Sequence, residues 1–134
     1  MINFWAILAA VAANMAIGSL WYSPLLFGKT WLKHMKIKPA DIKKMRKKGN
    51  KAMLLAIIPS FILAYVLAQF IDYMNAETIP MSATLAFWLW IGFVFTTNSN
   101  SVLFEQKTKT VFIIGMGYHL FSMLVMAAIL AVWR

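Results

Sequence analysis

The chain has 134 residues, of which 62% are hydrophobic and only 13% are charged, whereas about 25% of an ordinary soluble domain is charged. A single domain of this length has too little interior to hide that much apolar surface from water, so the composition excludes an ordinary soluble globular protein. The chain has no Cys, which excludes disulfides, thiol chemistry and Cys-based metal sites.

The first apolar stretch covers residues 3–22, about the 20 residues that a helix needs to cross a bilayer. The start of the chain, Met1–Phe4, lacks the basic region of a signal peptide, so we expect this stretch to remain a span of the mature protein. Small residues recur in the stretch at steps of four, a spacing typical of close helix contacts in membranes. They are Ala6, Ala10, Asn14 and Gly18.

A basic segment of residues 23–51 follows, and it holds ten of the thirteen Lys and Arg residues. Because this charge lies in one loop between apolar stretches, we expect anionic lipid headgroups as its partner and no nucleic acid. The segment is either an anchor that only sets the topology or a surface that recruits lipid or an acidic partner. The residues expected to face the lipid surface are Lys43, Lys44, Arg46, Lys47 and Lys48.

The basic segment also carries helical signals. Trp31, Leu32 and Met35 fall on one helical face, with lysines around it. Pro39 suits the first turn of a second short helix, which Gly49 would end. We therefore expect an interfacial element that lies on the inner leaflet of the membrane.

The second apolar stretch, residues 52–73, also repeats small residues every four positions. The row comprises Ala52, Ala56, Ser60, Ala64 and Ala68, and Asp72 continues it. Two such rows predict that the first and second spans pack tightly together. Pro59 has no N–H to bond the carbonyl of Leu55, so we expect a bend in this span.

The third apolar stretch, residues 81–100, ends in a run of six uncharged polar residues, Thr96–Ser101. Either the helix ends here in a turn capped by these side chains, or it continues with a polar inner third that must face protein or water. Glu105 follows the run, and its candidate partners are Lys107, Lys109 and the basic segment.

The fourth apolar stretch, residues 110–133, places its polar side chains at helical steps. The row comprises Gly115, His119, Ser122 and Met126. From the rise of a helix, His119 lies near the middle of its span, as Asn14 and Ser60 do in theirs. Such side chains either hydrogen-bond across helices as structural contacts or form a binding or conduction site.

The distribution of cations predicts the orientation. The basic segment and the loop with Lys107 and Lys109 together hold twelve of the thirteen cations. The positive-inside rule therefore places both basic loops in the cytoplasm and both termini outside. Stretches of this length cross a membrane as helices. We predict an all-α fold, one bundle of four transmembrane helices over residues 1–134.

The sequence holds no motif that indicates catalysis or cofactor binding. It has no Gly-rich phosphate loop, no nucleophile elbow and no HExxH. The two His residues, His34 and His119, lie in different regions and fall short of the usual ligand number of a metal site. We therefore expect no enzyme activity, no cofactor and no metal.

Two sequence segments carry a family resemblance. The first reads WYSPLLFGK from Trp21 to Lys29, with Trp31 after it, and the second reads GYHL from Gly117 to Leu120. Together with Phe104-Glu105, they resemble a bacterial family of small four-span membrane proteins, domain of unknown function family 1761. The resemblance covers essentially the whole chain, and the Lys-rich segment from Lys33 to Lys51 is not part of its motifs. It implies the fold class and a bacterial inner-membrane location, and it implies no activity. The motif positions are Trp21, Tyr22, Pro24, Gly28, Glu105, Tyr118 and His119.

Two functions are compatible with these observations. The first is a small oligomeric transporter or channel-like protein with a polar layer near the bilayer midplane, and the second is a structural or accessory subunit that binds anionic lipid or an unknown membrane partner through the basic segment. We expect a homo-oligomer in either case. The candidate binding or pathway residues are Asn14, Ser60, Thr96, Asn98, Asn100, Glu105, Tyr118, His119 and Ser122.

Overall fold

The computed structural model describes residues 2–36, 39–105 and 108–133, and all regular structure within these ranges is helical. The all-α prediction is therefore confirmed for the described residues. The elements are α1 (Phe4–Trp21), α2 (Gly28–His34), the short 3₁₀ helix η1 (Pro39–Asp41), α3 (Ile42–Leu55), α4 (Ile57–Tyr73), α5 (Ile79–Leu89), the π-helical segment η2 (Trp90–Phe95), α6 (Thr96–Leu103) and α7 (Lys109–Val132).

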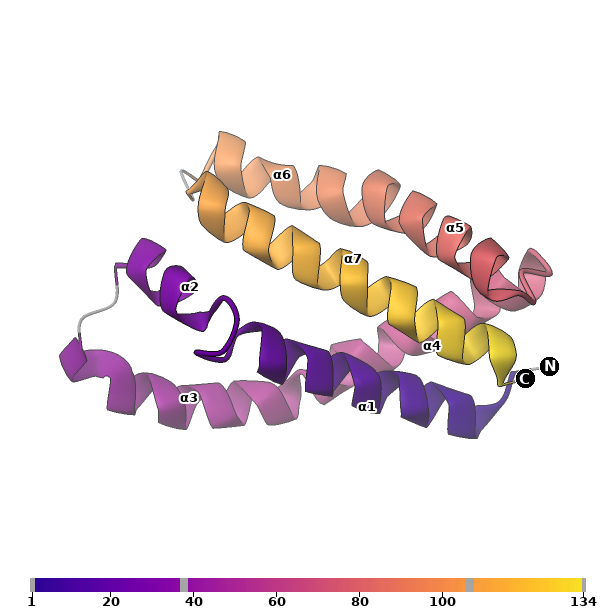
Figure 1. Ribbon diagram of the computed structural model, residues 1–134, viewed down its shortest axis with the longest axis horizontal. Coiled ribbons are helices and arrows are strands. Elements are labelled where there is room, and N and C mark those ends of the chain that lie inside the picture. The colour runs from indigo at the N-terminus through magenta and orange to yellow at the C-terminus, as the bar shows by residue number, and fades with distance from the viewer. Residues whose placement is uncertain (1, 37–38, 106–107, 134) are drawn as a thin grey trace.

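Four helical stretches in the described ranges are long and apolar enough to cross a membrane, and they agree with the four predicted spans. They are Phe4–Trp21, Lys47–Tyr73, Ile79–Leu103 and Lys109–Val132. Figure 1 shows both chain termini at one end of the molecule, with α2, the start of α3 and the α6–α7 connection at the other end. The described parts of the two basic loops therefore lie at the same end, away from the termini.

Helix α7 lies at the centre of the fold and packs against α1, α4 and α5. The predicted pairing of the first two spans is also present, because α1 packs against α4. Ala10 and Ala64 are completely buried in this region, and Ala6 and Ala68 nearly so. Small side chains allow the backbones to approach closely, which is what the four-residue spacing predicts.

The second span differs from its predicted form at the start. Gly49 does not end a short helix, because α3 continues through it to Leu55 and leads directly into α4. A glycine ends a helix when it adopts positive φ, and the glycines of the described ranges all have negative φ. Residues 42–51 of the basic segment thus belong to the helix that leads into the second span.

The bend predicted from Pro59 is confirmed. The helix is interrupted at Ala56, between α3 and α4, next to the Leu55 carbonyl that Pro59 leaves without an N–H donor. Figure 1 shows α4 leaving at an angle to α3.

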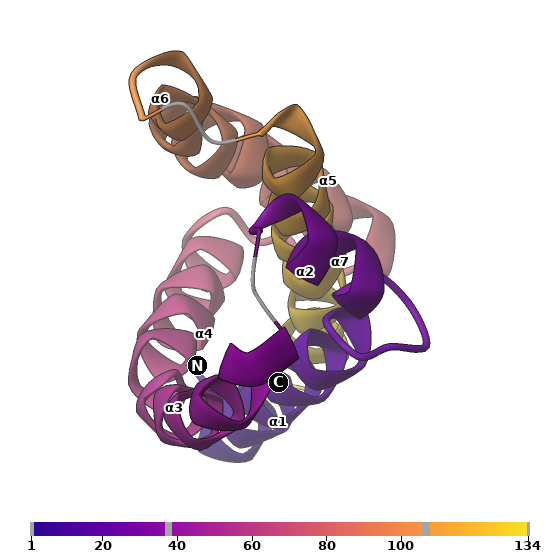
Figure 2. The same ribbon diagram turned by 90° about the vertical axis from the view of Figure 1, so that its left-hand side faces the viewer.

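The third span runs without interruption through α5, η2 and α6, so the polar run Thr96–Ser101 is helical and the helix continues past residue 100 to Leu103. Figure 2 shows α6 apart from α1, α3 and α4. No residue of α6 is buried. The third span contacts the rest of the molecule mainly through α7.

Candidate functional site

The buried polar residues of three helices meet at Asn14. The Asn14 side-chain amide donates a hydrogen bond to Ser60 Oγ of α4 (2.6 Å). On the other side, Ser122 Oγ of α7 donates to Asn14 Oδ1, and Tyr118 OH, also of α7, donates to the same oxygen (2.8 Å). Four of the predicted candidate residues are thus brought together, and we call them the Asn14 cluster: Asn14, Ser60, Tyr118 and Ser122.

The Asn14 cluster is closed on itself. Asn14, Ser60 and Ser122 are each less than 9% exposed, and each polar side chain of the cluster bonds another member. In the described part of the chain, no buried side-chain nitrogen or oxygen lacks a hydrogen-bond partner. Buried polar groups that bond one another in this way stabilise helix packing, and a passing solute could bind them only by replacing these hydrogen bonds.

His119 lies outside the Asn14 cluster although it has a similar depth. Its ring contacts the neighbouring Tyr118 ring, with the centroids 5.1 Å apart, and no hydrogen bond joins it to Asn14, Ser60 or Ser122 in the structure. Within the described residues, no three His, Asp or Glu side chains come together as a metal-binding group.

The polar run of α6 is not part of the same site. Thr96 Oγ1 donates to the Gly92 carbonyl (2.6 Å) and Asn98 Nδ2 to the Val94 carbonyl (2.8 Å), so these side chains bond their own helix. Thr97, Ser99 and Ser101 do the same. Thr96, Asn98 and Asn100 are exposed, as is Glu105 beyond the helix, and Lys107 lies outside the described residues.

The first motif segment forms a compact turn at the end of α1. Gly28 N donates to the Ser23 carbonyl (3.0 Å), and Pro24 lies exposed in the turn between them. A Cβ atom at Gly28 would lie 2.5 Å from the Tyr22 carbonyl oxygen. Any side chain there would therefore force the backbone apart, so the turn requires glycine at this position.

The two motif segments contact each other. The Trp21 indole N–H donates to the Ile114 carbonyl of α7 (3.0 Å). A Cβ atom added at Gly117 would come within 3.3 Å of the same indole. The Tyr22 and Tyr118 rings meet edge to face with centroids 5.8 Å apart. The segments on which the resemblance depends thus fasten the end of α1 to α7.

A cavity of about 360 Å³ opens beside this contact, between the end of α1 and α3. We call it the α1–α3 groove, and its walls include Gly18 and Tyr22 of α1, Gly49, Ala52 and Met53 of α3, and Tyr118 of α7. A second cavity of about 340 Å³, lined by Tyr22, Trp31 and Leu32, shares Tyr22 with it. The lining is mainly apolar, as in most ligand sites.

Exposed cations are spaced along α3. The exposed lysines of this helix are Lys44, Lys47, Lys48 and Lys51. Lys48 directly precedes the groove residue Gly49 in the sequence, and Lys51 directly precedes Ala52. The side chains of the predicted residues Lys43 and Arg46 lie outside the described part of the structure.

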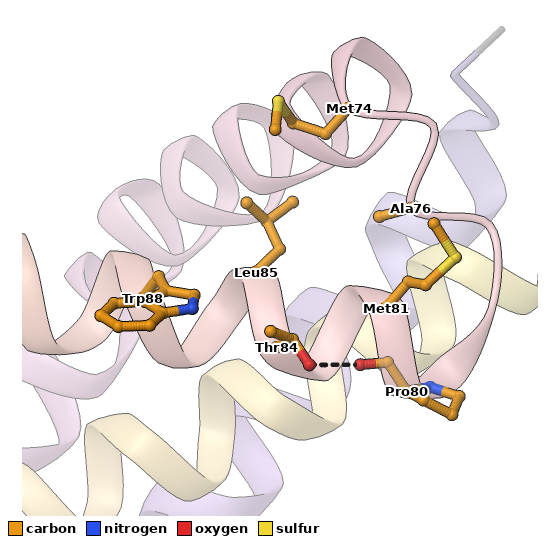
Figure 3. Close-up of a pocket in the computed structure, with 7 residues that line it drawn as sticks. All are labelled: Met74, Ala76, Pro80, Met81, Thr84, Leu85 and Trp88. Carbon is orange, nitrogen blue, oxygen red and sulfur yellow. Dashed lines mark hydrogen bonds between the residues drawn. The ribbon is translucent and has the colours of Figure 1, made fainter.

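Two other cavities differ from the groove in having no lysine beside their lining residues in the sequence. One of about 420 Å³ lies between α4 and α5, and Figure 3 shows its lining, where the Thr84 hydroxyl bonds the Pro80 carbonyl (2.8 Å). The other, of about 330 Å³, is lined by apolar residues of α4, α5, η2 and α7, including Phe70, Phe93 and Met123.

The groove and the hydrogen bond of Trp90 were not among the features predicted from the sequence. The Trp90 indole donates to the Met116 carbonyl (3.1 Å) and fixes the third span to α7, as Trp21 does for the first. A tryptophan inside an apolar span rather than at its end is a signal for such a bond, because a buried indole N–H needs an acceptor. The groove has no comparable signal, since it depends on the separation of α1 and α3.

Comparison with known proteins identifies the family of the chain but assigns no activity to it. No curated protein and no solved structure matches the chain significantly. A family model described as "protein of unknown function (DUF1761)" matches residues 5–131, which is nearly the whole chain and confirms the resemblance found in the sequence, so the chain belongs to this family.

Proposed function

We propose that the protein is a four-span protein of the bacterial cytoplasmic membrane with both termini outside, and that it serves as a structural or accessory subunit that binds anionic lipid through α2 and α3. Four apolar helices and the position of both basic loops at one end support this topology. A homo-oligomer and an unknown membrane partner remain parts of the proposal.

One observation carries the lipid-binding role. The exposed lysines Lys44, Lys47, Lys48 and Lys51 are on a helix that continues into the second candidate span. This continuity would hold their charge at the level of the headgroups. A basic residue near an anionic membrane surface contributes about 1 kcal/mol of attraction, so four on one helix suffice for a strong preference for anionic lipid.

Transport is the second candidate, and the buried Asn14 cluster is the observation that favours it. Polar side chains deep in a membrane protein often mark a pathway. The mutual hydrogen bonds of the cluster favour the structural role instead, because a solute would have to displace them. We expect no enzyme activity, since the sequence holds no catalytic motif.

The lipid-binding role is tested by native mass spectrometry of the protein released from equimolar palmitoyl-oleoyl phosphatidylglycerol and phosphatidylcholine. The wild type is expected to retain the anionic lipid preferentially. Replacing Lys44, Lys47, Lys48 and Lys51 by Gln should reduce that preference about tenfold or more. The matched control replaces the same four lysines by Arg and should keep it. An unchanged preference in the Gln variant would refute the proposed function.

A further inference from the structure

We propose that the α1–α3 groove binds one acyl chain of a single anionic phospholipid, whose headgroup lies beside the lysines of α3. The inference rests on the proposed function and deepens it, because it assigns a defined site to one lipid in place of a general attraction to the membrane surface.

Apart from the Tyr22 hydroxyl, the polar side chains that line the groove have hydrogen-bond partners, so the groove offers a mainly apolar surface to its occupant. The Tyr118 hydroxyl donates to Asn14. Ser19 Oγ, which also lines the groove, donates to the Met15 carbonyl (3.0 Å) and contacts Met53 Sδ of α3 (3.6 Å). What remains are aromatic faces, methyl groups and a thioether, which suit a hydrocarbon chain.

Position 49 of the groove wall is a glycine. A Cβ atom at Gly49 would meet no atom within 4 Å, although the residue lies inside a helix, where glycine costs about 1 kcal/mol relative to alanine. A larger side chain at this lining position would therefore take up space at the groove without a clash. Gly49 is therefore the point at which the groove can be filled while the fold is kept.

The size and extent of the groove fit a lipid chain. Its volume of about 360 Å³ is within the range of roughly 300–1,000 Å³ that is usual for ligand pockets. A neighbouring cavity of about 340 Å³ shares Tyr22 with the groove and is also lined by Trp31 and Leu32 of α2. Apolar space thus lies on both sides of Tyr22, close to the basic end of the molecule.

The charge beside the groove selects an anionic headgroup. Lys48 and Lys51 are exposed and directly precede Gly49 and Ala52 of the groove wall on α3. Successive residues of a helix point in different directions, so the two lysines share the level of the groove along the helix axis, and their long, flexible side chains can bring the ammonium groups to its edge. In α2, the exposed Lys33 follows Leu32 of the neighbouring cavity. The apolar cavity that includes Phe70 and Phe93 has no such neighbours. An occupant with an apolar tail and a negative head therefore matches the α1–α3 groove and not the other cavities.

The test fills the groove by replacing Gly49 with Leu and counts the lipids that survive mild detergent in native mass spectrometry. The probes are palmitoyl-oleoyl phosphatidylglycerol, the corresponding phosphatidylcholine, and glycerol 1-phosphate, which has the anionic head without a tail. The wild type should retain one phosphatidylglycerol per chain and no glycerol phosphate. In Gly49→Leu, the fraction of chains that retain this lipid should fall at least tenfold, while the midpoint of thermal unfolding stays equal or rises.

The matched control is Asn50→Leu, which adds the same side chain to the neighbouring exposed position outside the groove and should retain the lipid. Ala52→Leu is a second groove-filling variant, which decides the test if Gly49→Leu does not fold. Undiminished retention in a folded groove variant overturns the proposed site, and so does binding of glycerol phosphate alone. In either case the lysine-to-glutamine variant still tests the proposed function separately, since it alters charge and leaves the groove open.

Discussion

The Asn14 cluster and the polar run of α6 place uncharged polar side chains in otherwise apolar helices, and the fold uses them in opposite ways. In the cluster, side chains from α1, α4 and α7 bond one another and are buried or half-buried. In α6, side chains such as Thr96 and Asn98 bond carbonyl groups of their own helix and are exposed.

This difference separates local from tertiary hydrogen bonding. A Ser, Thr or Asn side chain that bonds a carbonyl three or four residues earlier is satisfied without any other helix, so it adds little to the packing of the fold. A side chain that bonds another helix loses its hydrogen bond when the two helices separate. We infer that the polar contribution to helix packing is concentrated at Asn14, and that the α6 run is nearly neutral for the stability of one chain.

The largest expected effect is that of Asn14→Leu. Cross-helix hydrogen bonds in membranes contribute ~0.6 kcal/mol each on average, so the loss of three bonds should lower the free energy of unfolding by about 2 kcal/mol or more. The stranded Ser60 and Ser122 hydroxyls add to this loss. The measurement is unfolding of the purified protein in mixed detergent micelles, followed by circular dichroism.

The control for this variant is Asn98→Leu, the same substitution in the α6 run. Because the Asn98 amide bonds only its own helix, we expect a change of about 0.5 kcal/mol or less. Equal losses at the two positions would contradict the distinction between tertiary and local hydrogen bonds.

Much of this arrangement could be predicted from the sequence because helical spacing and span length are local properties. Most ends of the four predicted stretches lie within a few residues of the ends of the apolar helices in the structure. Depth along the helix also predicted that Asn14 and Ser60 lie at one level. The bend at Ala56 followed from the missing N–H of Pro59. Each of these predictions needs only the geometry of a single helix.

The remaining features depend on how helices rotate and separate, which single-helix geometry does not give. His119 has the right depth and lies in one helical row with Ser122, yet its imidazole makes no bond to the cluster. The sequence is compatible with Gly49 at the end of a helix and with Gly49 inside one, and its negative φ in the structure distinguishes the two. The α1–α3 groove depends on the angle at which α3 leaves the bend.

A smaller effect is expected for Ser122→Ala, which removes one of the two hydroxyl groups that donate to Asn14 Oδ1 and leaves Tyr118 as its donor. The loss should be about 1 kcal/mol in the free energy of unfolding. Ser101→Ala in α6 is the matched control and should cause no loss, because the Ser101 hydroxyl bonds only the Asn98 carbonyl. A loss at Ser101 as large as that at Ser122 would show that α6 has a partner in the folded state.

The smallest effect is expected for His119→Leu, and its smallness is informative. His119 has the depth of the Asn14 cluster without its hydrogen bonds, so the substitution removes a ring contact with Tyr118 and leaves every bond of the cluster in place. We expect a change within about 0.5 kcal/mol in the free energy of unfolding and unaltered retention of phosphatidylglycerol. A loss comparable to that of Asn14→Leu would mean that the imidazole has a polar partner in the assembled protein. Intact stability combined with lost solute flux in proteoliposomes would favour the transport function over the accessory one, since a residue that contributes nothing to packing would then be needed for passage.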